Sequence, residues 1–363
     1  RGYPSDRIVT PIIINGDMSV CQRTTSTSSV SSGSTFPVDR YKFMPNALGT
    51  FTISQSTTVP TGQGFSNSIK VDCTTANTSP GDGSTLQLVQ YLEGQNLQLL
   101  KKGTSSAEAV TISFWVRSNK TGTYTLELYD NDNTRQISQT YTISSADTWE
   151  KKIVNFAGDT SGALGNDNGL SFAVQFWLAT GANYNNESLQ TSWNTVTQAK
   201  RVSSSQVNLA DSTSNEWYIT GLQLEVGEFD STSIPSFPFE SFENNLRKCQ
   251  RYYYKHMSGN GKNICSGNYY DSGTFYGSVF FPVPMRASPS LEMVSGTDYY
   301  RLATANSSNN GLLDDFNVGF IAYAGDGISI GLGVNSGLSG VGGYGATMSG
   351  NNSSAELAFG SEL

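Results

Sequence analysis

Few side chains in this sequence are of the kinds that carry enzymatic chemistry. The single histidine, His256, lies beside Lys255 and outside any motif for an activated serine or cysteine nucleophile. The four cysteines are far apart and form neither a CxxC pair nor a Cys/His cluster, so they indicate no metal site and no disulfide framework: Cys21, Cys73, Cys249 and Cys265. We therefore expect no catalytic residue and no enzymatic activity.

Paired acidic residues are the remaining source of catalysis, because glycoside hydrolysis needs two carboxyl groups at a set separation. Asp130 with Asp132, and Asp314 with Asp315, are such pairs. Both pairs lie in turn-like contexts, where Asp and Asn are favoured for backbone reasons. Structural turn positions are the preferred interpretation.

Oxygen-rich runs offer a second kind of chemistry. The runs DNDN (130–133) and GNDN (165–168) carry the oxygen ligands that Ca²⁺ prefers, but neither has the spacing of an EF-hand loop. We assign no cofactor and no metal ligand, and we keep a calcium site as an alternative without specific residues.

Three stretches alternate apolar with polar or aromatic residues, with the period of two typical of β-strands: AVTISFWVRS (109–118), TYTLELYDNDN (123–133) and LSFAVQFWLA (170–179). Val110, Phe114 and Leu126 are among the residues predicted to face the core. The aliphatic and Phe residues mark the core face of each stretch. The opposite face carries aromatic rings beside amide, carboxylate and guanidinium groups, a combination that suits a sugar. The alternative is that these tryptophans pack under a loop or against another subunit. The candidate carbohydrate-binding residues are Trp115, Arg117, Glu127, Tyr129, Gln175 and Trp177.

The elements that must position these residues are predicted to be strands. Ser, Thr, Asn and Gly are abundant and only 14% of the residues are charged, which is typical of β-proteins with many polar turns. Eight or more strands without alternating helices indicate an all-β fold: an antiparallel β-sandwich of jelly-roll type, followed by a short helix and a small Gly-rich β-domain.

Two changes in composition divide the chain. Prolines in STSIPSFPFE (231–240) close the strand-rich region. From Met257 onward the sequence holds 19 of the 37 glycines and only three basic residues. The predicted parts are a connector (1–10), the jelly-roll domain (11–230), a linker with a short amphipathic helix (231–256) and the Gly-rich domain (257–363).

The linker has the spacing of a short coiled-coil seam. Its apolar positions step by 3, 4, 3 and 4 residues, and its charges run from acidic to basic along the helix, as the helix dipole favours. Two heptads are too short to hold a trimer alone, so flanking domains must supply most of the contact. The predicted seam is Phe239, Phe242, Leu246, Cys249 and Tyr253, and the residues Tyr252–Tyr254 are predicted to change the chain from helix to strand.

Charge and hydropathy exclude two classes of partner. The net charge of -8 gives no basic surface for nucleic acid or an anionic membrane. No run approaches 18 consecutive apolar residues, so membrane insertion is not expected.

Several segments resemble a known family, the phage tail-fibre-like (receptor-binding) proteins with a sandwich related to carbohydrate-binding modules. The resemblance covers roughly residues 11–293. Its most specific parts are the NGDM start, which is expected to be a first strand, and the CQRYY linker. The segments that carry it are IINGDMSVCQR (13–23), DRYKF (39–43), SFWVRS (113–118), WYITGLQLEVG (217–227), the CQRYY linker and FFPVPMRASPSL (280–291).

The resemblance implies a homotrimeric, extracellular virion appendage that joins other tail proteins and adheres to host cell-surface polysaccharide. Two alternatives remain. One is a structural decoration or tail protein that binds no glycan, and the other is a polysaccharide-degrading tailspike, which needs a groove with paired acids.

Overall fold

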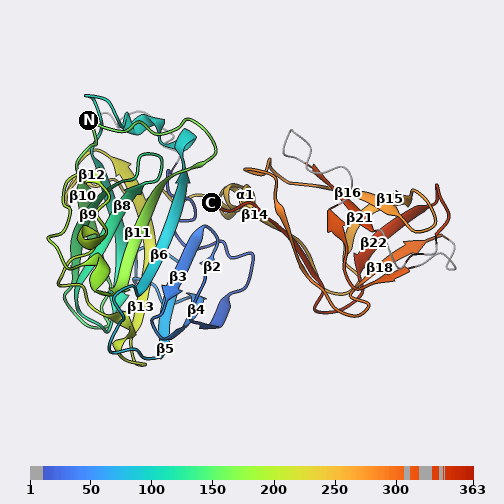
Figure 1. Cartoon of the computed structure of the whole chain (residues 1–363), viewed down its shortest axis with the longest axis horizontal. Helices are drawn as coiled ribbons and strands as arrows, with labels where there is room; N and C mark the ends of the chain where they lie inside the picture. Colours follow the sequence, from blue (N-terminus) through green and yellow to red (C-terminus); the bar gives the residue numbers. More distant parts are fainter. Residues whose placement is uncertain (1–10, 306–310, 319–328, 335–337, 339) are drawn as a thin grey trace. The chain divides into compact units, whose positions relative to one another are not determined.

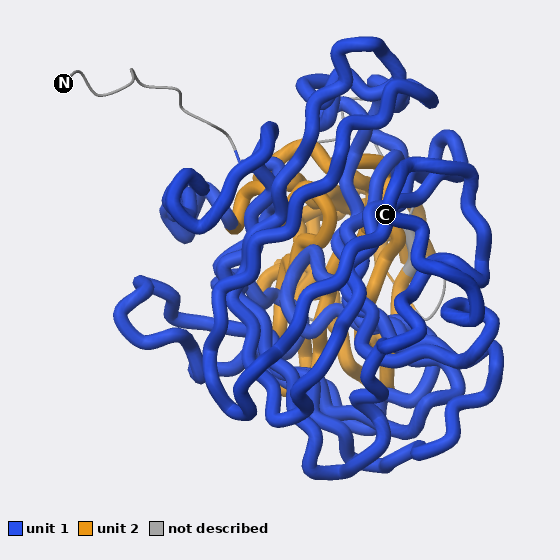
Figure 2. Tube along the Cα trace, turned by 90° about the vertical axis from the view of Figure 1, so that its left-hand side faces the viewer, with its two compact units in different colours: residues 1–245, 363 blue, residues 246–362 orange. Residues whose placement is uncertain are grey.

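A computed structural model describes residues 11–363 except for 306–310, 319–328, 335–337 and 339. The predicted connector, residues 1–10, lies outside the described residues. The chain divides into two compact units, the first comprising residues 1–245 with Leu363 and the second residues 246–362 (Figure 2).

Two antiparallel sheets form the first unit. The six-stranded sheet has the order β1 (Ser26–Val30), β4 (Thr50–Ser56), β5 (Ser68–Thr75), β13 (Glu216–Val226), β7 (Val110–Ser118) and β10 (Glu150–Phe156). The seven-stranded sheet has the order β12 (Asn194–Thr195), β9 (Arg135–Ile143), β8 (Gly122–Asp130), β11 (Leu170–Thr180), β6 (Thr85–Glu93), β3 (Tyr41–Asn46) and β2 (Thr35–Val38).

The inner faces of both sheets share one core, as an antiparallel sandwich requires. Phe114 on β7 packs edge-to-face against Phe176 on β11, with ring centroids 5.0 Å apart, and Phe176 also contacts Trp217 on β13. The predicted core positions Val110 and Leu126 are buried in the same cluster. The all-β sandwich prediction is confirmed, because the alternating stretches place their aliphatic and Phe residues in this core, except for the half-buried Leu170 at the start of β11.

The NGDM segment differs from its expected strand. Residues 11–23 form an irregular segment, and both Asn15 (φ 60°) and Met18 (φ 59°) have left-handed backbone conformations that a strand cannot contain. The buried Asn15 side chain donates to the Val20 and Asp39 carbonyls. Gly16 is required here because a Cβ atom would lie 2.2 Å from the Leu222 carbonyl oxygen. The segment is therefore a tied-down turn.

The helix α1 (Phe242–Gln250) is nine residues long and contains only three of the five predicted seam positions. Phe239 precedes it and contacts Phe65, while Tyr253 begins the strand β14 (Tyr253–Ser258). Phe242 is 59% exposed, but Cys249 is 0% exposed. A continuous helical seam through all five residues is therefore wrong, because the chain turns to strand at Tyr252–Tyr254, the predicted place of that change.

The second unit is a small β-domain with its own core. Its three-stranded sheet consists of β14, β23 (Glu356–Gly360) and β17 (Ser290–Val294). Its seven-stranded sheet has the order β19 (Gly311–Leu313), β18 (Tyr300–Thr304), β22 (Gly345–Gly350), β15 (Asn263–Tyr269), β16 (Phe275–Phe280), β21 (Ser329–Val334) and β20 (Asn317–Val318). The prediction of a short helix followed by a Gly-rich β-domain is confirmed.

Within the part of the chain that the structure describes, no helix has the length and apolar character needed to cross a bilayer.

Candidate functional site

The six predicted sugar-contacting residues lie on two different sheets. Trp115 and Arg117 are on β7 of the six-stranded sheet, whereas the other four are on β8 and β11 of the seven-stranded sheet, which lie side by side in Figure 1. All six point away from the shared core, as their phase predicts. They nevertheless cannot form one site, because the sandwich core separates the two groups.

The group on the six-stranded sheet is a set of paired charges. The Arg117 guanidinium lies 5.0 Å from the centroid of the Tyr218 ring and donates to Asp147 at 2.8 Å. Lys70 also lies over that ring and pairs with Glu216 at 2.6 Å. Tyr218 is only 5% exposed, so its ring face is not available to a ligand.

Glu127 lies at the centre of the seven-stranded group, and its carboxylate is fully engaged. Both oxygens accept hydrogen bonds from the Arg201 guanidinium, at 2.8 and 2.9 Å, and Oε2 also accepts one from Trp177 Nε1 at 2.8 Å. Burial lowers the pKa of Arg201, but the charge and hydrogen bonds of Glu127 more than compensate and raise it. Since Glu127 is 0% exposed, it cannot contact a ligand directly.

Trp177 is covered in the same way. Tyr184 packs on the indole, with ring centroids 5.4 Å apart, and the Arg201 guanidinium lies 5.2 Å from the indole centroid. The side chain is 0% exposed. The prediction that a sugar stacks on Trp177 is therefore wrong. The structure shows the alternative, in which this tryptophan packs under a loop.

The covering loop, here called the strap, comprises residues 182–206. It includes the 3₁₀ turns η3 (Ala182–Tyr184) and η4 (Gln198–Lys200), and β12. Val202 N donates to the Tyr184 carbonyl at 2.9 Å, which closes the strap on itself, and Ser138 Oγ donates to the Arg201 carbonyl at 2.8 Å. The strap is thus fixed to the sheet by backbone bonds as well as by the buried ion pair.

Beside the strap, the outer face of the sheet carries tyrosines and amides. Register places Ala173 of β11 opposite Tyr91 of β6 on one side and Tyr129 of β8 on the other. Both tyrosines are partly exposed, and Gln87 Nε2 donates to Gln175 Oε1 at 3.1 Å in the adjoining rows. We call Gln87, Tyr91, Tyr129 and Gln175 the tyrosine–amide face.

A cation lies over one face of each of these tyrosine rings. Lys42 Nζ lies 5.2 Å from the centroid of the Tyr91 ring, and Arg201 lies 5.3 Å from that of Tyr129. Each contact restricts a ring before any ligand arrives. The face therefore presents two oriented, partly exposed phenol rings on a rigid sheet, whereas the paired Gln87 and Gln175 amides are each only 7% exposed.

Two of these residues, Gln87 and Tyr91, were missed in the sequence prediction. They alternate with the buried Leu86, Leu88 and Leu92 along β6, so the same period of two that selected Tyr129 could have found them. Gln90 obscured the pattern, because it is a polar residue in the inward phase. Its amide is buried, accepting from the Ile14 N–H and donating to the Ile14 carbonyl.

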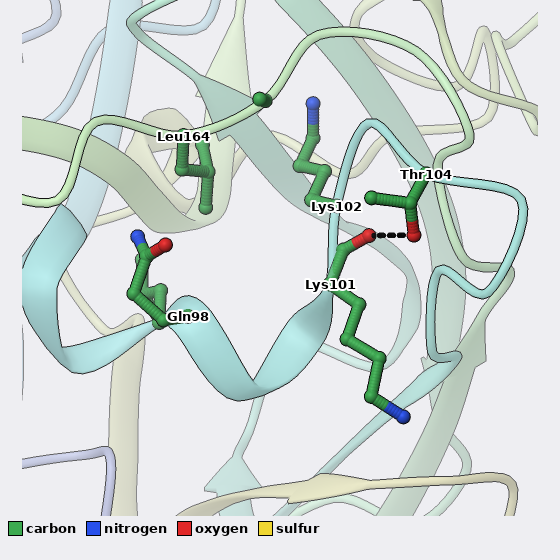
Figure 3. Close-up of a pocket in the computed structure, with 7 residues that line it drawn as sticks. Gln98, Lys101, Lys102, Thr104 and Leu164 are labelled. Atoms are coloured by element: carbon green, nitrogen blue, oxygen red, sulfur yellow. Dashed lines mark hydrogen bonds between the residues drawn. The ribbon is translucent and has the colours of Figure 1, made fainter.

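A separate pocket of about 370 Å³ lies at the end of β6, next to the 3₁₀ turns η1 (Gly94–Asn96) and η2 (Gln98–Leu100). Figure 3 shows Lys101 and Lys102 diverging on its rim, with Leu164 and Gln98 facing each other. Lys101 pairs with Glu108, and Lys102 pairs with Asp130 and Asp159. Because both ammonium groups are neutralised, this pocket offers no charge for recognising an anion.

The DNDN run (130–133), considered for calcium, has a lysine as its cation: the Lys102 ammonium pairs with Asp130. It contacts the Asp130 carboxylate, Asp159 Oδ2 at 2.9 Å and the Gly162 carbonyl at 2.8 Å. Asp130 Oδ1 also accepts from Asn133 N at 3.0 Å, as expected for a turn. In the described ranges no group of three or more His, Cys, Asp or Glu side chains could hold a metal ion.

The remaining candidates for chemistry have structural partners. His256 Nε2 lies 2.7 Å from the Ile264 carbonyl and Nδ1 lies 3.1 Å from Tyr254 Oη. Burial lowers the pKa of His256, and the bond to Ile264 opposes this only in part. Asp314 Oδ1 accepts from Asp298 N at 2.8 Å, which is a turn role for that acid.

No family model and no curated protein matches the chain. Several solved structures resemble part of the chain. The enzymatically active domain of tailspike protein 4 from bacteriophage CBA120 shares 13% identity over 60% of this chain, with a TM-score of 0.30, and the match spans 21% of that protein.

Two carbohydrate-binding modules resemble the chain to a similar degree. A family 4 module shares 11% identity, covering 58% of this chain and 97% of the module, with a TM-score of 0.29. A family 11 module from Clostridium thermocellum, in complex with a β-1,3-1,4-mixed-linked tetrasaccharide, shares 12% identity, covering 56% of this chain and 97% of the module, with a TM-score of 0.28.

Proposed function

We propose that the chain is a non-enzymatic glycan-binding protein and that the tyrosine–amide face contacts the sugar. The observation that carries this proposal is the row Tyr91–Ala173–Tyr129 above the Gln87–Gln175 amide pair. Phenol rings pack against the apolar C–H face of a sugar, and their hydroxyls both donate and accept hydrogen bonds. The face is preformed, which lowers the entropy cost of binding.

The state of the Glu127 carboxylate supports the proposal of a role without catalysis. Glu127 is the acid at the centre of the face, and three donors hold it in a buried ion pair. A general acid or nucleophile in glycoside hydrolysis has to reach the glycosidic oxygen or the anomeric carbon. Glu127 cannot do so under the strap, which favours binding over depolymerisation.

The biological setting we propose is a phage tail fibre. Its support is the sequence resemblance through the NGDM and CQRYY segments. In this setting the protein is a homotrimer in the virion tail, extracellular, joined to other tail proteins and attached to host surface polysaccharide. Three weak sites on one particle would act together, because linked binding events raise the effective concentration.

Replacing Tyr91 or Tyr129 by alanine tests the binding proposal. Each variant is expected to weaken binding to the recognised polysaccharide on a glycan array by about tenfold, which equals about 1.4 kcal/mol. Trp115→Ala is the matched control, because it removes a partly exposed aromatic side chain from the opposite sheet. It should bind like the wild type.

Three results would contradict the proposal. Loss of binding in the Trp115 variant with retention in both tyrosine variants would move the site to the six-stranded sheet. Absence of wild-type binding to any host polysaccharide would favour the structural decoration protein. Release of reducing sugar during incubation would favour the tailspike enzyme.

The oligomer prediction has its own measurement. Light scattering on the purified protein should give three times the 39.1 kDa mass of one chain. A monomeric mass at micromolar concentration would refute the trimer and leave the glycan-binding proposal standing.

A further inference from the structure

The strap contains a second pocket, of about 480 Å³. Lys200 in its lining precedes Arg201, whose guanidinium lies 5.3 Å from the Tyr129 ring centroid of the tyrosine–amide face. The lining is entirely polar: Asn185, Asn186, Glu187, Ser188, Lys200 and Ser204. The volume lies in the range of small-ligand sites. The pocket is next in sequence to Tyr184 and Arg201, the two residues that anchor the strap on Trp177 and Glu127.

The walls of this pocket are fixed by backbone pairing. Glu187 N donates to the Ala199 carbonyl at 3.1 Å, and Gln190 N donates to the Lys200 carbonyl at 2.9 Å. Two segments of the strap are thereby held alongside each other, and the ion pair beneath them is buried. A ligand would meet side chains that are already in place, so little ordering would be needed on binding.

The chemistry of the lining selects the kind of ligand. Two amides and two hydroxyls supply both donors and acceptors, and none of the six residues is aromatic or aliphatic. The charges are one of each sign, with Lys200 Nζ 3.5 Å from Glu187 Oε2. A pocket with balanced charge has no preference for an anion over a neutral ligand.

We propose that this pocket is the end subsite for the glycan chain and takes one neutral terminal sugar residue, held by hydrogen bonds from Asn186, Ser204 and their neighbours. The inference rests on the proposed function of the tyrosine–amide face and adds a position to it. The face would contact inner sugar residues through rings, and the strap pocket would recognise the hydroxyl groups at the chain terminus.

Filling the pocket tests the inference. Ser204→Trp places a large side chain at the lining, whereas Ser205→Trp places the same side chain on the next exposed residue, outside the lining. The probe is the shortest oligosaccharide fragment of the polysaccharide that binds the wild type, together with the same fragment shortened by one terminal sugar at either end. Affinities are measured by calorimetry.

The wild type and Ser205→Trp should lose about tenfold in affinity when the terminal sugar is removed from one end of the fragment. Ser204→Trp should bind the full fragment about tenfold more weakly than the wild type and show no further loss on shortening. Asn186→Ala, which removes a contact without adding bulk, should shift in the same direction by a smaller factor.

Equal affinities of Ser204→Trp, Ser205→Trp and the wild type for the full fragment would overturn the end subsite. If Tyr91→Ala still weakened binding in that case, the proposed function would stand and only the strap pocket would be refuted. Failure of the wild type to bind any fragment would instead refute the proposed function.

Discussion

Lys102→Met is expected to destabilise the first unit by about 3–5 kcal/mol, the cost of removing one partner from a buried ion pair. Lys102 is 4% exposed, and its ammonium contacts the Asp130 and Asp159 carboxylates and the carbonyls of Ser161 and Gly162. Without the lysine, Asp130 loses its ion pair, and Asp159 retains its pair with Arg135. Urea unfolding followed by tryptophan fluorescence measures the loss, because all five tryptophans lie in the first unit.

The neighbouring Lys101→Met is the matched control. Lys101 also forms an ion pair, at 2.5 Å from Glu108, but the two side chains are 53% and 38% exposed. An exposed pair contributes about 1 kcal/mol or less. Equal effects of the two substitutions would contradict the role assigned to the buried cluster.

Acid should reveal the same cluster. Burial would raise the pKa of Asp159, but hydrogen bonds from Arg135 and Lys102 outweigh it and lower that pKa below its usual value of 3.8. The folded state therefore binds this proton less readily than the unfolded chain, so the stabilisation exists above about pH 4 and is lost as the pH falls through the lower folded value. In Lys102→Met the acid transition should begin at higher pH, because one of the compensating donors is gone.

Strand phase could be predicted from the sequence, whereas the assignment of strands to sheets could not. The phase of a strand is a local property, because successive side chains point to opposite faces of the sheet. In β7 (Val110–Ser118), Phe114 lies in the core as predicted. Sheet assignment is not local. A short connection joins β7 to β8, and a short connection favours pairing of the two strands in one sheet as a hairpin. The chain instead crosses there from the six-stranded to the seven-stranded sheet. This crossing separated Trp115 from Glu127.

The sequence pattern also could not predict which candidate residues are exposed to solvent and which are covered. The outward phase of Trp177 was correct, but the strap that covers it comes from residues 182–206, which have little periodicity. Likewise, NGDM was expected to be a strand, because the left-handed conformations of Asn15 and Met18 have no signature in the apolar pattern. Hydrogen bonds hold the NGDM segment in its conformation. Asn245, which lies in the FENN run before the CQRYY segment, donates to Asp17 Oδ1 and accepts from Asn15 N.

Arg201→Met is expected to have an effect of similar size, about 3–5 kcal/mol, because it leaves Glu127 buried without its cation. Local opening should accompany the loss of global stability, since Arg201 anchors the strap that Tyr184 and Val202 close. Limited trypsin digestion should then cut faster after Lys200, and urea unfolding should report the free-energy change. Arg117→Met, which breaks a pair with the 58% exposed Asp147, is the control and should cost about 1 kcal/mol or less.

The double variant Glu127→Gln/Arg201→Met separates the charge from the packing. A neutral amide removes the uncompensated charge and can still accept from Trp177 Nε1, so the double variant should recover much of the stability lost in Arg201→Met. Binding should not recover with it. Arg201 also lies against the Tyr129 ring and holds the strap pocket in place, so both variants should bind glycan more weakly than the wild type. Recovery of binding along with stability would show that the ion pair supports the fold alone, and that the tyrosine–amide face needs no help from the strap.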